Sequence, residues 1–114
     1  MKEKPPKENL RDKWENSYRR RENFIFYPHE ELIRFVSKYI RKRVGLDKWE
    51  DVDIVEGGGR ILDLGCGIGQ HLIYLNETGL DPYGVDLSEP ALELARKWAE
   101  RRGMSNLQER ILQT

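Results

Sequence analysis

The stretch that decides the fold runs from Ile61 to Gly69 and reads ILDLGCGIG. A short apolar run ends in an acid and then in glycines spaced G-x-G-x-G, which let a backbone turn sharply and approach a ligand closely. A second run, YGVDLS at residues 83–88, ends in another acid, Asp86. Asp86 lies 21 residues after Gly65, the length of a loop, a helix and a strand. The pattern predicts a βαβ unit that binds a nucleotide.

The residues around these two runs predict a parallel sheet with flanking helices, the α/β class. The run at 60–64 is apolar without alternation, as in a parallel strand that is covered on both faces. Ser88 is a favoured helix N-cap, and Gly79 and Gly103 are favoured helix stops. We therefore expect strands at 60–64, 83–86 and 107–112, and helices at 70–78 and 89–102.

The N-terminal residues predict a tail and a short helix. Residues 1–12 are polar, carry two prolines and show no apolar period, so we expect an unstructured tail. A helix is expected at 13–23, where Trp14 and Tyr18 are four residues apart and share a face.

A longer amphipathic helix is expected next. Pro28 suits a helix start, and the cations that end at Arg43 suit the negative end of the helix dipole. Residues 46–59 end in three glycines and are expected to form an irregular connector.

Composition excludes several classes of protein. The 114 residues hold 20 basic and 20 acidic side chains, which argues against non-specific nucleic-acid binding, since that needs a basic surplus. No apolar run approaches the roughly 18 residues that span a bilayer, and the first residues lack a signal peptide's apolar core. Cys66 is the only cysteine, which excludes a disulfide framework and a cysteine-rich metal site. We expect one soluble, cytoplasmic domain with no metal.

Three features discriminate between nucleotides. Gly69 comes one place earlier than the third glycine of the dinucleotide fingerprint. Asp63 suits an ammonium or a sulfonium better than a pyrophosphate, because opposite charges attract strongly in a partly dry site. Asp86 can accept hydrogen bonds from both hydroxyls of a ribose and would repel the 2′-phosphate of NADP. A nucleoside that carries an α-amino acid fits all of these groups, and NAD stays open as an alternative.

The two motifs together resemble the first two motifs of class I S-adenosylmethionine-dependent methyltransferases, over residues 60–112. The resemblance implies a Rossmann-like fold, S-adenosylmethionine as the cofactor and S-adenosylhomocysteine as its product. It also implies that Asp86 holds the ribose and that Leu87 packs on the adenine. The residues that it places around the methionine part are Asp63, Gly65, Cys66, Gly67 and Gly69.

The N-terminal aromatic residues are similar to those of helices that cover the cofactor in some members of this family. Trp14, Tyr18 and Tyr27 are therefore candidate cofactor contacts, with packing in a core as the alternative. On this interpretation residues 1–27 form a tail and a candidate cover, and residues 28–114 form a partial S-adenosylmethionine-binding domain.

Other reactive side chains have plainer interpretations. Cys66 is interpreted as a small residue that the loop tolerates, instead of a nucleophile. His29 is interpreted as a surface group and His71 as a group on a helix face, instead of a base or a ligand. No catalytic residue is identified.

The resemblance covers only the first part of the family's fold. We expect a truncated Rossmann-like fold with a small parallel sheet in the order 3-2-1. Two functions stay open. One is a methyltransferase of which this is the N-terminal, cofactor-binding part, with an unidentified acceptor. The other is a non-catalytic S-adenosylmethionine- or S-adenosylhomocysteine-binding or assembly module that needs a partner chain or a missing C-terminal half.

Handedness predicts how the sheet is covered. Parallel crossovers are right-handed, so both connecting helices lie on one face of the sheet. The opposite face and the outer edge of strand 60–64 are then uncovered, which is typical of an association surface. We expect a homo-oligomer that forms through that face or edge.

Overall fold

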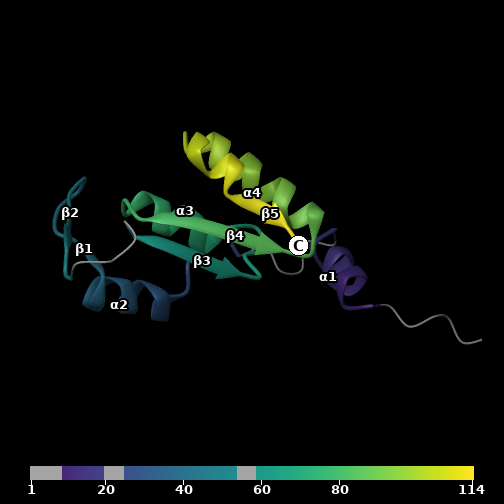
Figure 1. The fold of residues 1–114 in the computed structure, drawn as a ribbon, viewed down its shortest axis with the longest axis horizontal. Coiled ribbons are helices and arrows are strands. Elements are labelled where there is room, and N and C mark those ends of the chain that lie inside the picture. The colour runs from purple at the N-terminus through teal and green to yellow at the C-terminus, as the bar shows by residue number, and fades with distance from the viewer. Residues whose placement is uncertain (1–8, 20–24, 54–58) are drawn as a thin grey trace, which may run out of the picture.

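The computed structural model of the protein describes residues 9–19, 25–53 and 59–114. Within them the expected α/β class is confirmed (Figure 1). The helices are α1 (Leu10–Arg19), α2 (Glu30–Tyr39), α3 (Gln70–Glu77), α4 (Glu89–Arg101) and the short 3-10 helix η1 (Ser105–Glu109). The strands are β1 (Arg41–Arg43), β2 (Trp49–Asp51), β3 (Arg60–Leu64), β4 (Asp81–Asp86) and β5 (Ile111–Gln113).

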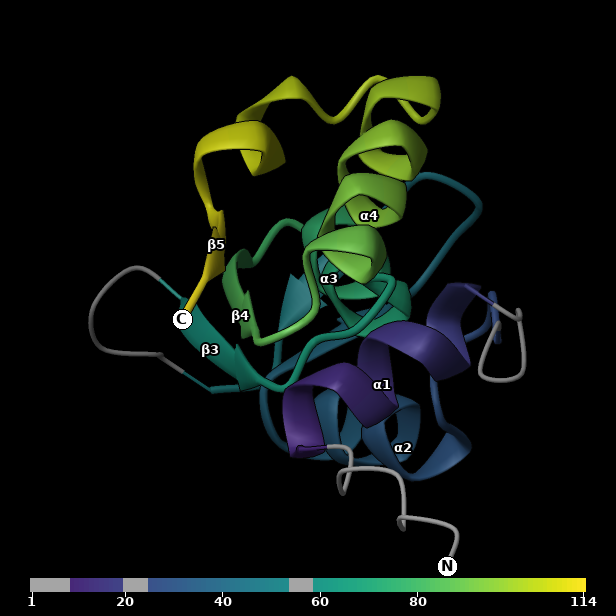
Figure 2. The same ribbon diagram turned by 90° about the vertical axis from the view of Figure 1, so that its right-hand side faces the viewer.

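The main sheet is parallel and has the strand order β3-β4-β5. Helix α3 connects β3 to β4, and α4 with η1 connects β4 to β5. Figure 2 shows α3 and α4 on the same side of this sheet, as right-handed crossovers predict. The three strands point toward the end of the molecule at which α1 lies (Figure 1).

The core lies between this sheet and its two helices. Leu72 and Ile73 of α3 pack with Leu92 of α4 and Ile111 of β5. Gly84 of β4 is required here by close packing. A Cβ at that position would lie 2.5 Å from Leu72 Cδ1 and 2.8 Å from the sulfur of Cys66, which lies in the same cluster. A second cluster, formed by Val36, Leu75 and Leu80, fastens α2 to α3.

Helix α1 starts earlier than the sequence predicted. Residues 10–12 belong to the helix and not to a tail, because the Asn9 side chain accepts a hydrogen bond from the backbone N–H of Asp12 at 2.8 Å and caps the first turn. Residues 1–8 of the predicted tail and residues 20–23 of the predicted helix lie outside the described residues.

The predicted helix over 28–43 is wrong at its C-terminal end. Helix α2 ends at Tyr39, and Arg41–Arg43 forms β1, which pairs antiparallel with β2 inside the predicted connector. Arg41 donates hydrogen bonds to the carboxylate of Asp51 at 2.6 Å and to the carbonyl of Thr78. These partners distant in sequence outweigh the weak attraction between cations and a helix end. Residues 54–58 of the connector are outside the described residues.

The third predicted strand is also shifted. Residues 107–109 belong to η1, and the strand is β5, at 111–113. Leu107 is fully buried in the core beneath α4, and the side-chain amide of Gln108 donates a hydrogen bond to the carbonyl of Arg96 at 2.8 Å. These two contacts stabilise a helical turn at residues for which the sequence predicted an extended strand.

One face of the sheet is open within the described part of the chain. Leu62 and Leu64 of β3 are 57% and 74% exposed, so the predicted coverage of this strand on both faces is wrong there. Leu64 pairs in register with Val85, and Val85 with Leu112, which forms a row across the three strands. In the same part of the chain, β3 pairs with β4 alone. No helix among these residues is long and apolar enough to span a membrane.

Candidate functional site

The glycine loop between β3 and α3 lies at the carboxyl end of the sheet. Gly65, Gly67 and Gly69 have φ values of 73°, 57° and 88°, in the left-handed region that favours glycine. The backbone N–H groups of Gly65 and Cys66 both donate to the carbonyl of Val85, at 2.8 and 3.0 Å. The loop is therefore fixed to β4, the neighbouring strand.

Two of these glycines serve different purposes. A Cβ on Gly69 would lie 3.1 Å from Cβ of Ala95, so this glycine lets the loop pack against α4. A Cβ on Gly65 would meet no atom within 4 Å among the described residues, apart from its two chain neighbours. The space next to Gly65 is open, and a ligand can approach the backbone there.

Asp86 ends β4 and binds the loop through its side chain. Its Oδ2 accepts a hydrogen bond from the N–H of Gly67 at 2.8 Å, and its Oδ1 accepts one from the N–H of Ser88 at 2.9 Å. Ser88 is buried and caps α4 by accepting from the N–H of Ala91. A carboxylate oxygen has two lone pairs, so each oxygen of Asp86 retains acceptor capacity for a hydroxyl.

Asp63, on β3, has an oxygen without a hydrogen-bond partner among the described residues. This atom, Oδ2, is buried. Burial, and next the negative charge of Asp86, raise the pKa of Asp63 to about 6, while His29 opposes the shift. A buried carboxylate without a partner is costly, and a cation or a hydrogen-bond donor beside it would relieve that cost. The site therefore suits a positively charged ligand group.

Two histidines, which the sequence analysis interpreted as a surface group and a group on a helix face, lie beside Asp63. His71 Nδ1 is 4.0 Å from Asp63 Oδ2. His71 Nε2 accepts a hydrogen bond from the backbone N–H of His29 at 3.3 Å, and the two imidazole rings meet edge to face at 4.6 Å. A usable signal was present in the sequence: a tight glycine loop returns the first turn of the next helix to the end of the strand it follows.

Cys66 lies in the core, 4% exposed. Burial, and next the charges of Asp63 and Asp86, raise the pKa of its thiol to about 12. Because only a thiolate is a good nucleophile, this thiol is unreactive while it is buried. The interpretation of Cys66 as a small residue that the loop tolerates agrees with this burial.

The remaining candidates are more widely spread. Leu87 is partly exposed, and its carbonyl accepts a hydrogen bond from the side-chain amide of Gln113 at 3.0 Å. Tyr27 is exposed. Trp14 and Tyr18 belong to α1, which packs on α4 (Figure 2), and their side chains are outside the described part of the structure.

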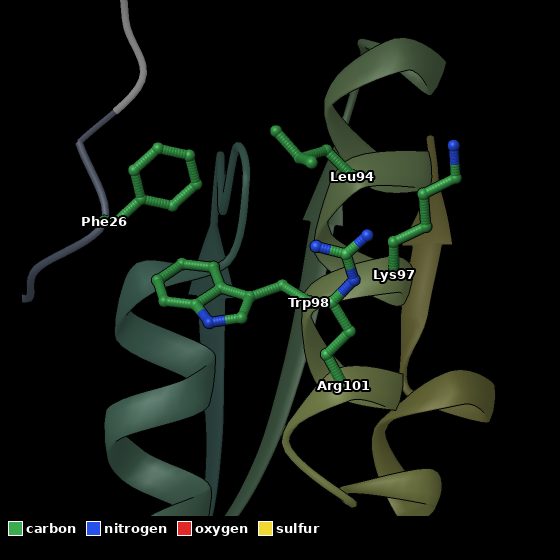
Figure 3. Close-up of a pocket in the computed structure, with 5 residues that line it drawn as sticks. All are labelled: Phe26, Leu94, Lys97, Trp98 and Arg101. Carbon is green, nitrogen blue, oxygen red and sulfur yellow. The ribbon is translucent and has the colours of Figure 1, made fainter.

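A separate groove lies on the outer side of α4. Phe26, which precedes α2, meets the Trp98 ring edge to face at 5.3 Å. The remaining lining residues all come from α4, and Figure 3 shows the Arg101 guanidinium on the side of Trp98 and the Lys97 amine pointing away from the aromatic pair. They are Leu94, Lys97 and Arg101.

Comparison with known proteins gives consistent results. Residues 61–113 match the protein family described as "Methyltransferase domain". The 2-heptyl-1-hydroxyquinolin-4(1H)-one methyltransferase of Mycobacteroides abscessus is 32% identical over 103 residues, 88% of this chain and 41% of that protein. The putative methyltransferase YqeM of Bacillus subtilis is 46% identical over 50 residues, 44% of this chain and 20% of that protein.

The fold has a counterpart among solved structures. The crystal structure of YjhP from E. coli superposes with a TM-score of 0.52 and 25% identity, covering 86% of this chain and 35% of that one. The chain thus spans less than half of the length of each of these relatives.

Proposed function

Residues 61–113 belong to a class I S-adenosylmethionine-dependent methyltransferase domain, and we propose that the chain is the cofactor-binding part of such an enzyme. The cofactor of this family is S-adenosylmethionine. The single observation that carries the proposal for these residues is the buried, unpartnered carboxylate oxygen of Asp63 beside the open glycine loop.

The proposed cofactor contacts follow the chemistry of each group. Asp63 holds the ammonium of the methionine part, because its carboxylate is an anion beside the open glycine loop. Asp86 holds the ribose hydroxyls through the lone pairs that Gly67 and Ser88 leave unused. Leu87 packs on the adenine. The backbone of Gly65, Cys66, Gly67 and Gly69 surrounds the methionine part.

Bound S-adenosylmethionine supplies a methyl group on a sulfonium, which is transferred to a nucleophile. The chain's own residues contribute orientation: a loop fixed at Val85 and Asp86 holds its ligand in one position. Correct placement of two reactants accounts for much of the rate in such reactions. The acceptor and its base are unidentified.

The N-terminal residues 1–27 are proposed as a cover over the domain formed by 28–114. Support comes from the position of α1, at the end of the molecule to which the strands point (Figure 1), and from its packing on α4. Trp14, Tyr18 and Tyr27 are the proposed contacts. The cytoplasmic location stays a prediction of the sequence.

We further propose that the open face of the sheet is an association surface, through which the chain forms a homo-oligomer. Leu64 and Leu112 are 74% and 54% exposed, and with Val85 they form a continuous apolar row. Such a row beside an unpaired strand edge is unfavourable in water. This surface would also suit the alternative function, an assembly module without catalysis of its own.

Calorimetry with S-adenosylmethionine, S-adenosylhomocysteine and NAD tests the proposed cofactor. We expect the first two to bind and NAD to bind more weakly or not at all. NAD binding that is equal or tighter would overturn the assignment. Methyl transfer by the isolated chain, with a range of acceptors, would contradict our expectation that cofactor binding alone resides here.

A further inference from the structure

Three groups from three segments of the chain form a row that ends at the glycine loop. The backbone N–H of His29, just before α2, donates to His71 Nε2 at 3.3 Å. On the other side of the same ring, His71 Nδ1 faces Asp63 Oδ2 at 4.0 Å. The row therefore connects the start of α2 to a carboxylate of the proposed cofactor site.

The hydrogen bond from His29 determines where the proton of His71 resides. A neutral imidazole has one protonated nitrogen and one acceptor nitrogen. Because Nε2 accepts from a backbone N–H, the proton is on Nδ1, the nitrogen that faces Asp63. A backbone N–H cannot change its role, so it specifies one tautomer.

The surroundings keep His71 neutral. Burial, and next the charge of His29, lower the pKa of His71. The charged and titratable groups that face it are Asp63 from β3 and His29 from the segment before α2, with Asp86 of β4 acting on Asp63. At neutral pH the His71 ring is thus a neutral donor beside an anion.

We propose that His71 is a positioning residue: its Nδ1–H becomes the hydrogen-bond donor to Asp63 Oδ2 when ligand binds, and the N–H of His29 fixes the tautomer that makes this possible. The separation of 4.0 Å is too long for a hydrogen bond. Such contacts commonly shorten once the ligand is bound. A donor at Oδ2 leaves the rest of the Asp63 carboxylate ionised and aimed at a cationic group.

The tautomer is tested first, on the wild-type chain without ligand. Long-range proton–nitrogen correlation spectra at neutral pH identify which ring nitrogen of His71 is protonated. We expect the Nδ1–H form, which is the minor tautomer of free histidine. Finding the proton on Nε2 would overturn the proposal, whatever the chain binds.

Two substitutions at residue 29 separate its backbone from its ring. His29 has φ −66°, a value that proline adopts, so His29→Pro suits the local backbone angle, replaces the N–H donor by a ring carbon and displaces the His71 ring from it. His29→Ala removes the ring and keeps the donor. We expect His29→Pro to shift His71 toward the Nε2–H tautomer and His29→Ala to leave it unchanged. An unchanged tautomer in His29→Pro would contradict the role of the backbone donor.

Two substitutions at residue 71 test the positioning role, which rests on the proposed cofactor function. His71→Asn keeps an N–H donor near the position of Nδ1, and His71→Leu removes it. We expect His71→Leu to weaken S-adenosylhomocysteine binding about tenfold or more, and His71→Asn to stay within about threefold of wild type.

The outcomes of these binding measurements are distinguishable. If wild type binds and His71→Leu binds equally well, the positioning role is wrong and the cofactor assignment stands. If wild type does not bind S-adenosylhomocysteine, the proposed function fails and the positioning role fails with it.

Discussion

The carboxylate of Asp86 accepts a hydrogen bond from the backbone N–H of Gly67 at 2.8 Å, which ties the end of β4 to the middle of the preceding glycine loop. The residue proposed to bind a ribose therefore also shapes the loop that would hold the rest of the ligand. Cofactor affinity and loop geometry are coupled through one side chain.

Substitution of Asp86 tests this coupling. Asp86→Ala leaves the N–H groups of Gly67 and Ser88 without their acceptor and removes the proposed ribose contacts. We expect a loss of about 1–3 kcal/mol in binding, roughly 5- to 150-fold in S-adenosylhomocysteine affinity, together with a measurable loss in the free energy of unfolding. Calorimetry and urea denaturation measure the two effects. Wild-type affinity in this variant would exclude Asp86 from the site.

The open space beside Gly65 gives a second prediction with a matched control. Gly65 and Gly103 have φ values of 73° and 70°, and in the part of the chain that the structure describes a Cβ on either residue meets no atom within 4 Å beyond its two chain neighbours. Alanine at either position costs about 1–2 kcal/mol in backbone strain. We expect similar losses of stability from Gly65→Ala and Gly103→Ala, and a loss of S-adenosylhomocysteine affinity from Gly65→Ala alone. Equal affinities in the two variants would contradict a ligand next to Gly65.

Ligand binding should depend on pH through Asp63. Its pKa is raised to about 6, so the carboxylate ionises between about pH 5 and 7. Because the proposed contact needs the ionised form, affinity for S-adenosylhomocysteine should rise across that range. His29, His71 and Asp86 also face this group, so Asp63→Asn is the control, and its weaker binding should lack the rise. A pH-independent affinity in wild type would contradict the contact.

The same residue should make the empty protein less stable. An acid whose pKa is raised on folding binds protons more readily in the native state, so its contribution to stability falls as pH rises from about 4 to 6. Asp63→Asn should therefore be more stable than wild type at pH 7, by up to about 3 kcal/mol, and no more stable at pH 4. Urea denaturation without ligand at the two pH values measures this difference. Greater stability of wild type at pH 7 would show that the ionised carboxylate is satisfied within the protein.

Association through the sheet can be tested with two leucines. Leu64, 74% exposed, lies in the open apolar row, and Leu46, 84% exposed, lies in the β1–β2 hairpin. Leu64→Glu should shift the chain toward the 13.5 kDa monomer in light scattering, and Leu46→Glu should not. A wild-type chain that is already monomeric at micromolar concentration, with no aggregation, would contradict the association surface.

The sequence predicted the strands, loop and helices around the site because interactions between residues close in sequence determine them. The G-x-G-x-G spacing locates the turn after β3, Ser88 caps α4, and the acids at the ends of β3 and β4 follow from two short apolar runs. The helix at 70–78 was confirmed to within one residue.

Errors arose where contacts distant in sequence decide the structure. The Arg41–Arg43 segment became a strand because Arg41 bonds to Thr78, 37 residues away. Leu107 lies in a helical turn because this conformation buries its side chain in the core beneath α4. The contact between His71 and His29 could not be predicted for the same reason, because the two residues are 42 positions apart and no spacing in the sequence indicates that they meet.

The close packing of Cys66 against Gly84 has a practical consequence. A thiol reagent reaches this sulfur only when the loop lifts away from β4, because the residue is buried and its neighbour leaves no room for added bulk. The labelling rate of this single cysteine therefore reports how often the loop opens. A ligand that stabilises the closed loop should lower that rate. Unchanged labelling at saturating S-adenosylhomocysteine would mean that the loop moves as freely with its ligand as without it.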